Sequence, residues 1–226
     1  MTGDGLPARA VAPRPGVQAV ISDFGGVLTS PLAGAFSAFE AHSGVPLVEL
    51  GRAMAAEGVR RGVNPLFELE TGRLTEAEFL GDLSGQLSRQ LRREVSLDGF
   101  GERYFADLEP NARVIQYMRE LGSRGYRMAI CTNNVREWEP RWRAMLPVDE
   151  IFDVVVDSAF VGVRKPQPRI YELTLEALGV APQDAIFLDD IEINCDAARA
   201  LGMVVVWFRS SEQAIEAIEA ILEGHH

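Results

Sequence analysis

Five polar residues follow apolar runs of this sequence, and their types suit chemistry on an anionic substrate. Asp23 follows "AVIS", Thr132 and Asn133 follow "MAIC", and Asp189 and Asp190 follow "AIFL". An aspartate can act as a nucleophile that divides a difficult displacement into two steps. Threonine and asparagine can donate hydrogen bonds to phosphoryl oxygens. If the apolar runs are parallel strands, these groups converge on one edge of a sheet.

A sixth polar residue, Lys165, stands before Pro166 in "VGVRKPQP", and we expect it at the same edge. Carboxylates clustered in one crevice repel, and each raises the pKa of the others unless a cation lies among them. A hard divalent ion with oxygen ligands, Mg²⁺, meets this need. The lysine and the metal would also neutralise charge on a phosphoryl group. The residues therefore predict Mg²⁺-assisted chemistry on a phosphorylated compound.

Alternating strands and helices would position these groups. Apolar runs rich in β-branched residues predict strands over residues 17–22, 127–131, 153–156, 185–188 and 203–208. Helical patterns cover residues 111–121, 137–145, 169–178, 195–201 and 212–222. This alternation predicts an α/β fold with a parallel sheet and helices on both faces. Ligands of such folds lie beyond the carboxyl ends of the strands.

One long segment breaks the alternation and divides the chain. Residues 33–108 predict successive helices without a strand, which would form a helical cap over the strand ends. Residues 17–32 and 109–223 would then form the α/β core domain. The Gly/Pro-rich residues 1–16 predict a flexible arm, and residues 224–226, "GHH", resemble the remnant of a purification tag.

The order Asp23, Thr132, Lys165 and Asp189–Asp190 resembles the four motifs of the haloacid dehalogenase-like superfamily. Three further stretches, "ELETGRLTEAEF", "KPQPRIYELTLEALGV" and "FLDDIEINCDAARALGM", resemble one branch of it. That branch contains the N-terminal phosphatase domain of soluble epoxide hydrolase and bacterial sugar-phosphate phosphatases. The resemblance implies a Rossmann-like core, a C1-type helical cap inserted after the first motif, and phosphatase activity.

The resemblance also implies a role for each matching residue. Asp23 would be the nucleophile that forms an aspartyl-phosphate, and Lys165 would steady both Asp23 and the phosphate. Thr132 and Asn133 would bind the phosphoryl oxygens. The ligands of Mg²⁺ would be Asp23, the Gly25 carbonyl and Asp190, while Asp189 and Asn194 would order the metal's waters and the active-site loop.

Gly25 departs from the pattern of the family. Most phosphatases of the superfamily carry a second aspartate there, which protonates the leaving oxygen and then activates water. A glycine keeps the metal-binding carbonyl, but loss of general acid–base catalysis costs about 10²–10⁴-fold in rate unless another group replaces it. We therefore expect a substrate with a good leaving group, such as a sugar 1-phosphate or an acyl phosphate, or one that supplies its own acid.

Composition limits the other partners. The 226-residue chain has a formal net charge of −11, which argues against a nucleic-acid binder because that function needs a basic face. It has no apolar run near the roughly 18 residues of a membrane span, and because residues 1–16 lack an apolar segment we expect no signal peptide there. Two distant cysteines, Cys131 and Cys195, predict no disulfide framework, as expected for a cytoplasmic protein.

Two other functions fit part of the pattern. One is a metal-independent dehalogenase of the same superfamily, against which the second acid of Asp189–Asp190 argues. The other is a catalytically weak binding or regulatory domain that lost its acid at Gly25. Trp138 and Trp142 stand four residues apart on one helical face, which favours packing and also permits a homodimer.

Overall fold

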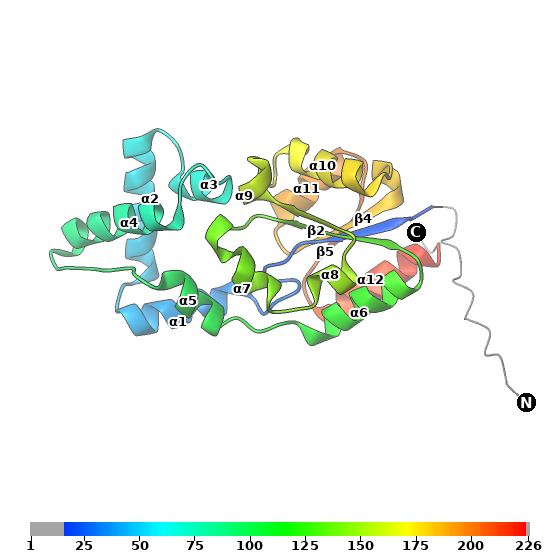
Figure 1. Ribbon diagram of the computed structural model, residues 1–226, viewed down its shortest axis with the longest axis horizontal. Helices are drawn as coiled ribbons and strands as arrows, with labels where there is room; N and C mark the ends of the chain where they lie inside the picture. The colour runs from blue at the N-terminus through cyan, green and yellow to red at the C-terminus, as the bar shows by residue number, and fades with distance from the viewer. Residues whose placement is uncertain (1–15, 225–226) are drawn as a thin grey trace, which may run out of the picture.

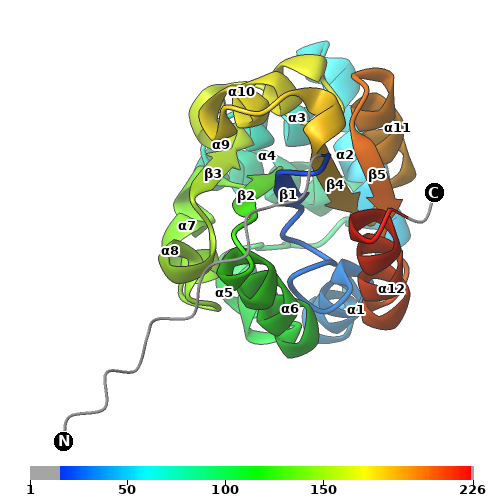
Figure 2. The ribbon, with the colours of Figure 1, turned by 90° about the vertical axis from the view of Figure 1, so that its right-hand side faces the viewer.

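The computed structural model (Figure 1) contains one parallel sheet, and Figure 2 shows its strand order, β3-β2-β1-β4-β5. Each predicted strand is present, and its ends lie within two residues of the expected ones. The strands are β1 (Ala19–Ser22), β2 (Arg127–Thr132), β3 (Val154–Asp157), β4 (Ala185–Asp189) and β5 (Val204–Trp207).

The structure describes residues 16–224, apart from the side chains of residues 33, 35, 36, 38 and 42 in the first helix. The expectations for a flexible arm over 1–16 and a tag remnant over 224–226 therefore concern segments that lie, except for Gly16 and Gly224, outside the described residues. None of the described helices is long and apolar enough to cross a membrane.

Helices cover both faces of the sheet, because successive strand residues alternate between two apolar clusters (Figure 2). Val20 and Ile130 pack toward α6 (Ala112–Ser123) and α12 (Ser211–Leu222), while Ile21 and Cys131 pack toward α10 (Pro168–Leu178) and α11 (Glu192–Ala200). Shorter elements connect these layers: η1 (Arg136–Trp138), α7 (Glu139–Arg143), α8 (Val148–Ile151), α9 (Ser158–Val161) and η2 (Pro182–Asp184).

The strand order reverses between β1 and β4. The chain runs from β1 through β2 to β3 on one side and then returns to place β4 on the other side of β1. The register pairs Ser22 with Leu188, so the residues that follow, Asp23 and Asp189, leave the sheet side by side. Such a switch point is where open α/β sheets bind ligands.

Five helices lie beyond the carboxyl ends of the strands (Figure 1), and we call them the cap. They pack around an apolar cluster of their own, which includes Ala53, Leu83 and Leu87. All five helices expected in this segment are present. They are α1 (Leu32–Ser43), α2 (Leu47–Arg61), α3 (Pro65–Glu70), α4 (Glu76–Leu91) and α5 (Phe100–Ala106).

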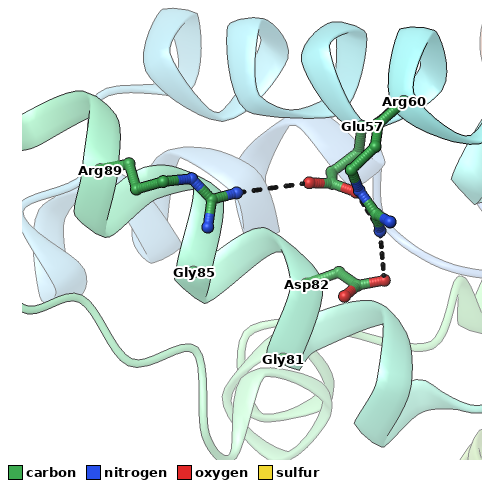
Figure 3. A pocket seen from close by; sticks show the side chains of 6 residues that line it. All are labelled: Glu57, Arg60, Gly81, Asp82, Gly85 and Arg89. Carbon is green, nitrogen blue, oxygen red and sulfur yellow. Dashed lines mark hydrogen bonds and ion pairs between the residues drawn. The ribbon is translucent and has the colours of Figure 1, made fainter.

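Charged residues join α2 to α4 within the cap (Figure 3). Arg60 lies 3.1 Å from Asp82, and Arg89 lies 3.7 Å from Glu57, which is buried. Figure 3 shows these four side chains facing one another above Gly81 and Gly85 of α4. These two ion pairs bridge α2 and α4.

The two tryptophans do not form an exposed face, so one reason to expect a homodimer is wrong. Trp142 is 0% exposed and packs on Phe24 with ring centroids 5.1 Å apart. Trp138 is half-buried, and its indole N–H donates to Glu76 of the cap at 2.8 Å. The helix expected over 137–145 is also shorter, because Pro140 confines α7 to a start at Glu139 after the turn η1.

Candidate active site

Asp23 stands at the switch point, one residue beyond β1. Its backbone N–H donates to the Leu188 carbonyl at 2.8 Å, which extends the pairing of β1 with β4 by one residue. Its carboxylate accepts from the Phe24 N–H at 2.6 Å and is almost wholly buried. Burial, together with the charges of Asp189 and Asp190, raises the pKa of Asp23 to about 7, although Lys165 acts in the opposite direction.

Lys165 lies between two carboxylates and is 1% exposed. Its Nζ is 2.7 Å from Asp23 Oδ1 and 2.7 Å from Asp189 Oδ2. Burial disfavours the ammonium, but Asp189 and Asp23 outweigh it and hold the pKa of Lys165 above its usual value. The sequence contains one lysine among 22 basic residues, the other 21 being arginines. That lysine occupies this site, where a compact ammonium fits between two acids.

Both carboxylate oxygens of Asp189 accept hydrogen bonds from other groups of the protein. It is 0% exposed, and its Oδ1 accepts from the Ile191 N–H at 2.8 Å while its Oδ2 binds Lys165. The Asn194 carboxamide donates to both oxygens at 3.1 and 3.2 Å, and the main-chain carbonyl of Asn194 accepts from the Tyr171 hydroxyl. Asp189 and Asn194 thus position Lys165 and the loop after β4, and their contact with metal-bound water stays a prediction.

Asp190 fits a bound cation. Its Oδ1 is buried without a hydrogen-bond partner among the described residues. Carboxylate oxygens of Asp23, Asp189 and Asp190 lie within 4.8 Å of one another. Three ionised carboxylates beside one lysine leave two negative charges, which a divalent ion would balance. The donors are all oxygen atoms, as Mg²⁺ prefers.

Gly26 allows this approach of the two loops. Its φ is +78°, in the left-handed region that favours glycine, and a Cβ atom there would lie 2.3 Å from Asp190 Oδ2. Any other residue would push against Oδ2 of Asp190. Gly26 thus combines a left-handed turn with a close approach to Asp190.

Thr132 and Asn133 leave β2 beside this cluster. Thr132 is buried at the end of the strand, where its partner in β3 is Asp157. The Asn133 carboxamide holds the main chain of Lys165: its Oδ1 accepts from the Lys165 N–H at 2.8 Å and its Nδ2 donates to the Lys165 carbonyl at 3.0 Å. Asn133 therefore positions the lysine, and the binding of phosphoryl oxygens by either residue stays a prediction.

Leu32, the first residue of the cap, lies where a side chain at Gly25 would point. A Cβ atom on Gly25 would be 3.3 Å from Leu32 Cδ1. The position that carries the second acid in most phosphatases of the superfamily therefore faces an alkyl group. The sequence showed that the acid was missing, but no local signal identified Leu32 as its neighbour.

A second cap residue that the sequence did not single out is Tyr104 of α5. Its ring stacks on Trp138 with centroids 5.1 Å apart, where the cap meets the core. Burial raises the pKa of Tyr104, and the charge of Asp23 raises it further, so its phenol stays protonated near Asp23. The segment "ERYFADL" has no pattern that marks this tyrosine.

Three arginines near the motifs differ in their surroundings. Arg164 reaches the cap, where its Nε lies 2.5 Å from Glu70 Oε2 and both side chains are largely buried. Arg136 donates to the Ala159 carbonyl within the core. Arg169 is at the surface and pairs with Glu176 of its own helix. Of the three, Arg164 is the one that ties the cap to the loop of Lys165.

The chain is similar to known proteins in sequence and in fold. Residues 17–202 match the family described as haloacid dehalogenase-like hydrolase. The chain belongs to this family. It is therefore a hydrolase of the haloacid dehalogenase-like superfamily, as the four motifs led us to expect, and the five-stranded parallel sheet is the family's α/β fold.

Several relatives of this hydrolase are phosphatases by name. It is 30% identical to phosphatase MT3486 from Mycobacterium tuberculosis, over 92% of this chain and 98% of the relative. It is 33% identical to the glyceraldehyde 3-phosphate phosphatase of Pyrococcus abyssi, over 72% of this chain and 74% of the relative. It is also 30% identical to mouse acyl-CoA dehydrogenase family member 10, over 91% of this chain, but the match spans only 19% of that protein.

Solved structures agree with the fold. A haloacid dehalogenase-family enzyme from Bacteroides thetaiotaomicron, crystallised with magnesium and inorganic phosphate, has a TM-score of 0.62 and 20% identity. The match covers 86% of this chain and 95% of the other. At this level of identity the likeness describes the fold of the hydrolase.

Proposed function

We propose that this hydrolase is a Mg²⁺-dependent phosphomonoesterase that works through an aspartyl-phosphate on Asp23. The observation that carries the proposal is the cluster at the switch point, in which Lys165 holds Asp23 beside Asp190. Mg²⁺, held by Asp23, Asp190 and the Gly25 carbonyl, would supply positive charge to the phosphoryl oxygens. Relatives named as phosphatases support the same class of reaction.

Asp23 is oriented for attack. The contacts from Lys165 and from the Phe24 N–H both fall on Oδ1, which makes Oδ2 the attacking oxygen. In the first step Oδ2 bonds to phosphorus and the ester oxygen leaves with its electron pair. In the second step water attacks the same phosphorus, the bond to Oδ2 breaks, and inorganic phosphate is released.

The first step lacks an acid at position 25. Gly25 has no side chain that could protonate the leaving oxygen, and Leu32 lies where such a side chain would point. We therefore propose a substrate whose leaving oxygen departs readily as an anion or carries its own acid. Aryl phosphates should react faster than alkyl phosphates of similar size, because loss of general acid catalysis costs about 10²–10⁴-fold for a basic leaving group.

The test measures phosphate release from phenyl phosphate and ethyl phosphate with Mg²⁺, for the native protein and for Asp23→Asn. We expect release from phenyl phosphate in the native protein, and none above background in the variant. Mass spectrometry should find one added phosphoryl group on the peptide that contains Asp23. Activity that survives in Asp23→Asn would refute the mechanism, and equal rates with the two esters would refute the role assigned to Gly25.

The same assay separates the two other candidate functions. A metal-independent dehalogenase would release chloride from 2-chloropropionate without Mg²⁺ and would not hydrolyse phenyl phosphate. A binding or regulatory domain would hydrolyse neither compound. The oxygen of Asp190 that lacks a partner favours the metal-dependent phosphatase over both, because neither alternative uses a cation there.

A further inference from the structure

A cavity of about 560 Å³ opens between the cap and the core, next to the proposed active site. The cap contributes residues from the end of α2 to the loop after α3, and the core contributes the loops that follow β2, β3 and β4. Two of its lining residues, Asn133 and Asn194, also contact Lys165 and Asp189 of the active site. Its volume falls in the range of small-molecule sites, about 300–1,000 Å³.

Four exposed apolar side chains, two from the cap and two from the core, line this cavity, and we call them the apolar wall. Val63 and Phe67 of the cap face Ile191 and Ile193 of the core across it, and each is at least 37% exposed. Ile193 is 60% exposed. When an apolar ligand covers alkyl groups that are exposed to water, the free energy of the system falls.

The polar groups of the cap side already have partners in the protein. Glu68 forms an ion pair with Arg61 at 3.3 Å, and the Thr71 hydroxyl donates to the Phe67 carbonyl at 2.6 Å. Arg73 reaches the Gly162 carbonyl at 3.5 Å. Each of these side chains thus already has at least one partner inside the protein.

The polar groups of the core side are engaged in the same way. Arg164 pairs with Glu70 and also covers one face of the Phe67 ring, at 4.0 Å from the ring centroid. Gln167 accepts from the Arg164 N–H at 3.0 Å. Asn133 and Asn194 make the active-site contacts described above. The cavity thus offers exposed alkyl and aromatic groups and polar groups that are already hydrogen-bonded.

We infer that this cavity binds the organic part of the substrate and that this part is apolar. The inference rests on the proposed function, because it assumes that the phosphoryl group lies at Asp23. A sugar or a glycerol body would place hydroxyl groups against Val63, Phe67, Ile191 and Ile193, whose side chains offer no hydrogen bond, and burying an unpaired hydroxyl is unfavourable. A phosphate ester of an alkyl-bearing phenol or of a similar apolar alcohol matches the wall.

The experiment uses phenyl, 4-ethylphenyl and 4-butylphenyl phosphate with Mg²⁺. Their leaving groups have nearly equal basicity, so the series varies the apolar length and keeps the chemistry constant. We expect kcat/KM to rise about two- to fourfold for each added methylene, and roughly tenfold or more from phenyl to 4-butylphenyl phosphate. Ile193→Asn should reduce this rise to less than about threefold, because it places an amide in the wall.

Val59→Asn is the matched control. Val59 is an 86% exposed apolar residue of the cap that does not line this cavity, so the rise should persist in that variant. Hydrolysis of phenyl phosphate with no rise along the series, or an equal rise in Ile193→Asn, would overturn the inference and leave the proposed function intact. A higher kcat/KM with glucose 6-phosphate than with 4-butylphenyl phosphate would overturn it too. Hydrolysis of none of these esters, or hydrolysis that persists unchanged in Asp23→Asn, would overturn the proposed function itself.

Discussion

Leu32 of the cap lies against Gly25 of the core, and a Cβ atom on Gly25 would be 3.3 Å from Leu32 Cδ1. The contact is tighter than an ordinary van der Waals distance, so an added side chain would have to displace the leucine. The acid is missing at Gly25, and Leu32 lies close to the space that its side chain would need. This relationship makes the effect of restoring the acid depend on residue 32.

We expect Gly25→Asp alone to raise the rate on ethyl phosphate little, because Leu32 obstructs the new carboxyl group. Gly25→Asp combined with Leu32→Ala should raise it by about 10²-fold or more, since general acid catalysis is worth roughly 10²–10⁴-fold. Leu32→Ala alone is the control and should leave the ratio of aryl to alkyl rates unchanged. A double variant that is no faster on ethyl phosphate than the native protein would contradict the role of position 25.

Removal of Lys165 should cost stability as well as activity. Lys165→Met keeps the length of the side chain but leaves Asp23 and Asp189 buried without their cation, which costs about 3–5 kcal/mol. Urea unfolding should show a greater loss at pH 8 than at pH 5, because the two carboxyl groups take up protons at the lower pH in the variant. Asp189→Asn in the same chain should recover part of the loss. An equal loss at both pH values would mean that charge is not the cause.

Mg²⁺ binding should be visible without any turnover. The partnerless Oδ1 of Asp190 predicts that Mg²⁺ at about 100 times its Kd raises the free energy of unfolding by about 2.7 kcal/mol and Tm by roughly 5 °C. Asp190→Ala should abolish this rise. Asp196→Ala removes an exposed carboxylate of α11 that pairs with Arg199, and it should keep the rise. A rise of the same size in Asp190→Ala would place the ion elsewhere.

Asp157 should make the fold less stable as the pH rises. Burial raises the pKa of Asp157 to about 7, from an unfolded value near 3.8, and no described residue bonds its Oδ2. Between these two values the unfolded state has lost the proton and the folded state keeps it, so the free energy of unfolding falls with pH. Asp157→Asn keeps an acceptor for the Ala159 N–H and has no proton to lose.

The measurement for Asp157 compares urea unfolding of the native protein and Asp157→Asn at pH 5 and pH 8. Relative to the native protein, the variant should gain roughly 2–3 kcal/mol on going from pH 5 to pH 8, because each pKa unit corresponds to about 1.4 kcal/mol. The comparison cancels the titration of groups common to both chains. A constant difference across this range would show that Asp157 is already ionised at pH 5.

The sequence by itself determined the sheet and the groups at its edge. Apolar runs end at Asp23, Thr132 and Asp189, and the alternation of strands and helices forces parallel strands, whose carboxyl ends share one edge. That is why the carboxylate cluster and Lys165 were predicted together, and why the glycine at position 25 was recognisable as a departure. The prediction of the cluster depends on local pattern and on topology, whereas the departure at Gly25 depends on the resemblance to the family.

The tertiary structure decided how the same residues are used. It turned the Asn133 carboxamide toward the backbone of Lys165, placed Leu32 against Gly25, and buried Trp142 in the core. It also brought Phe67 of the cap and Ile193 of the core, 126 positions apart in the chain, to one cavity. Apart from Leu32 and Gly25, which are seven positions apart, these contacts join segments distant in sequence. All of them follow from tertiary packing, which no local pattern of residues encodes.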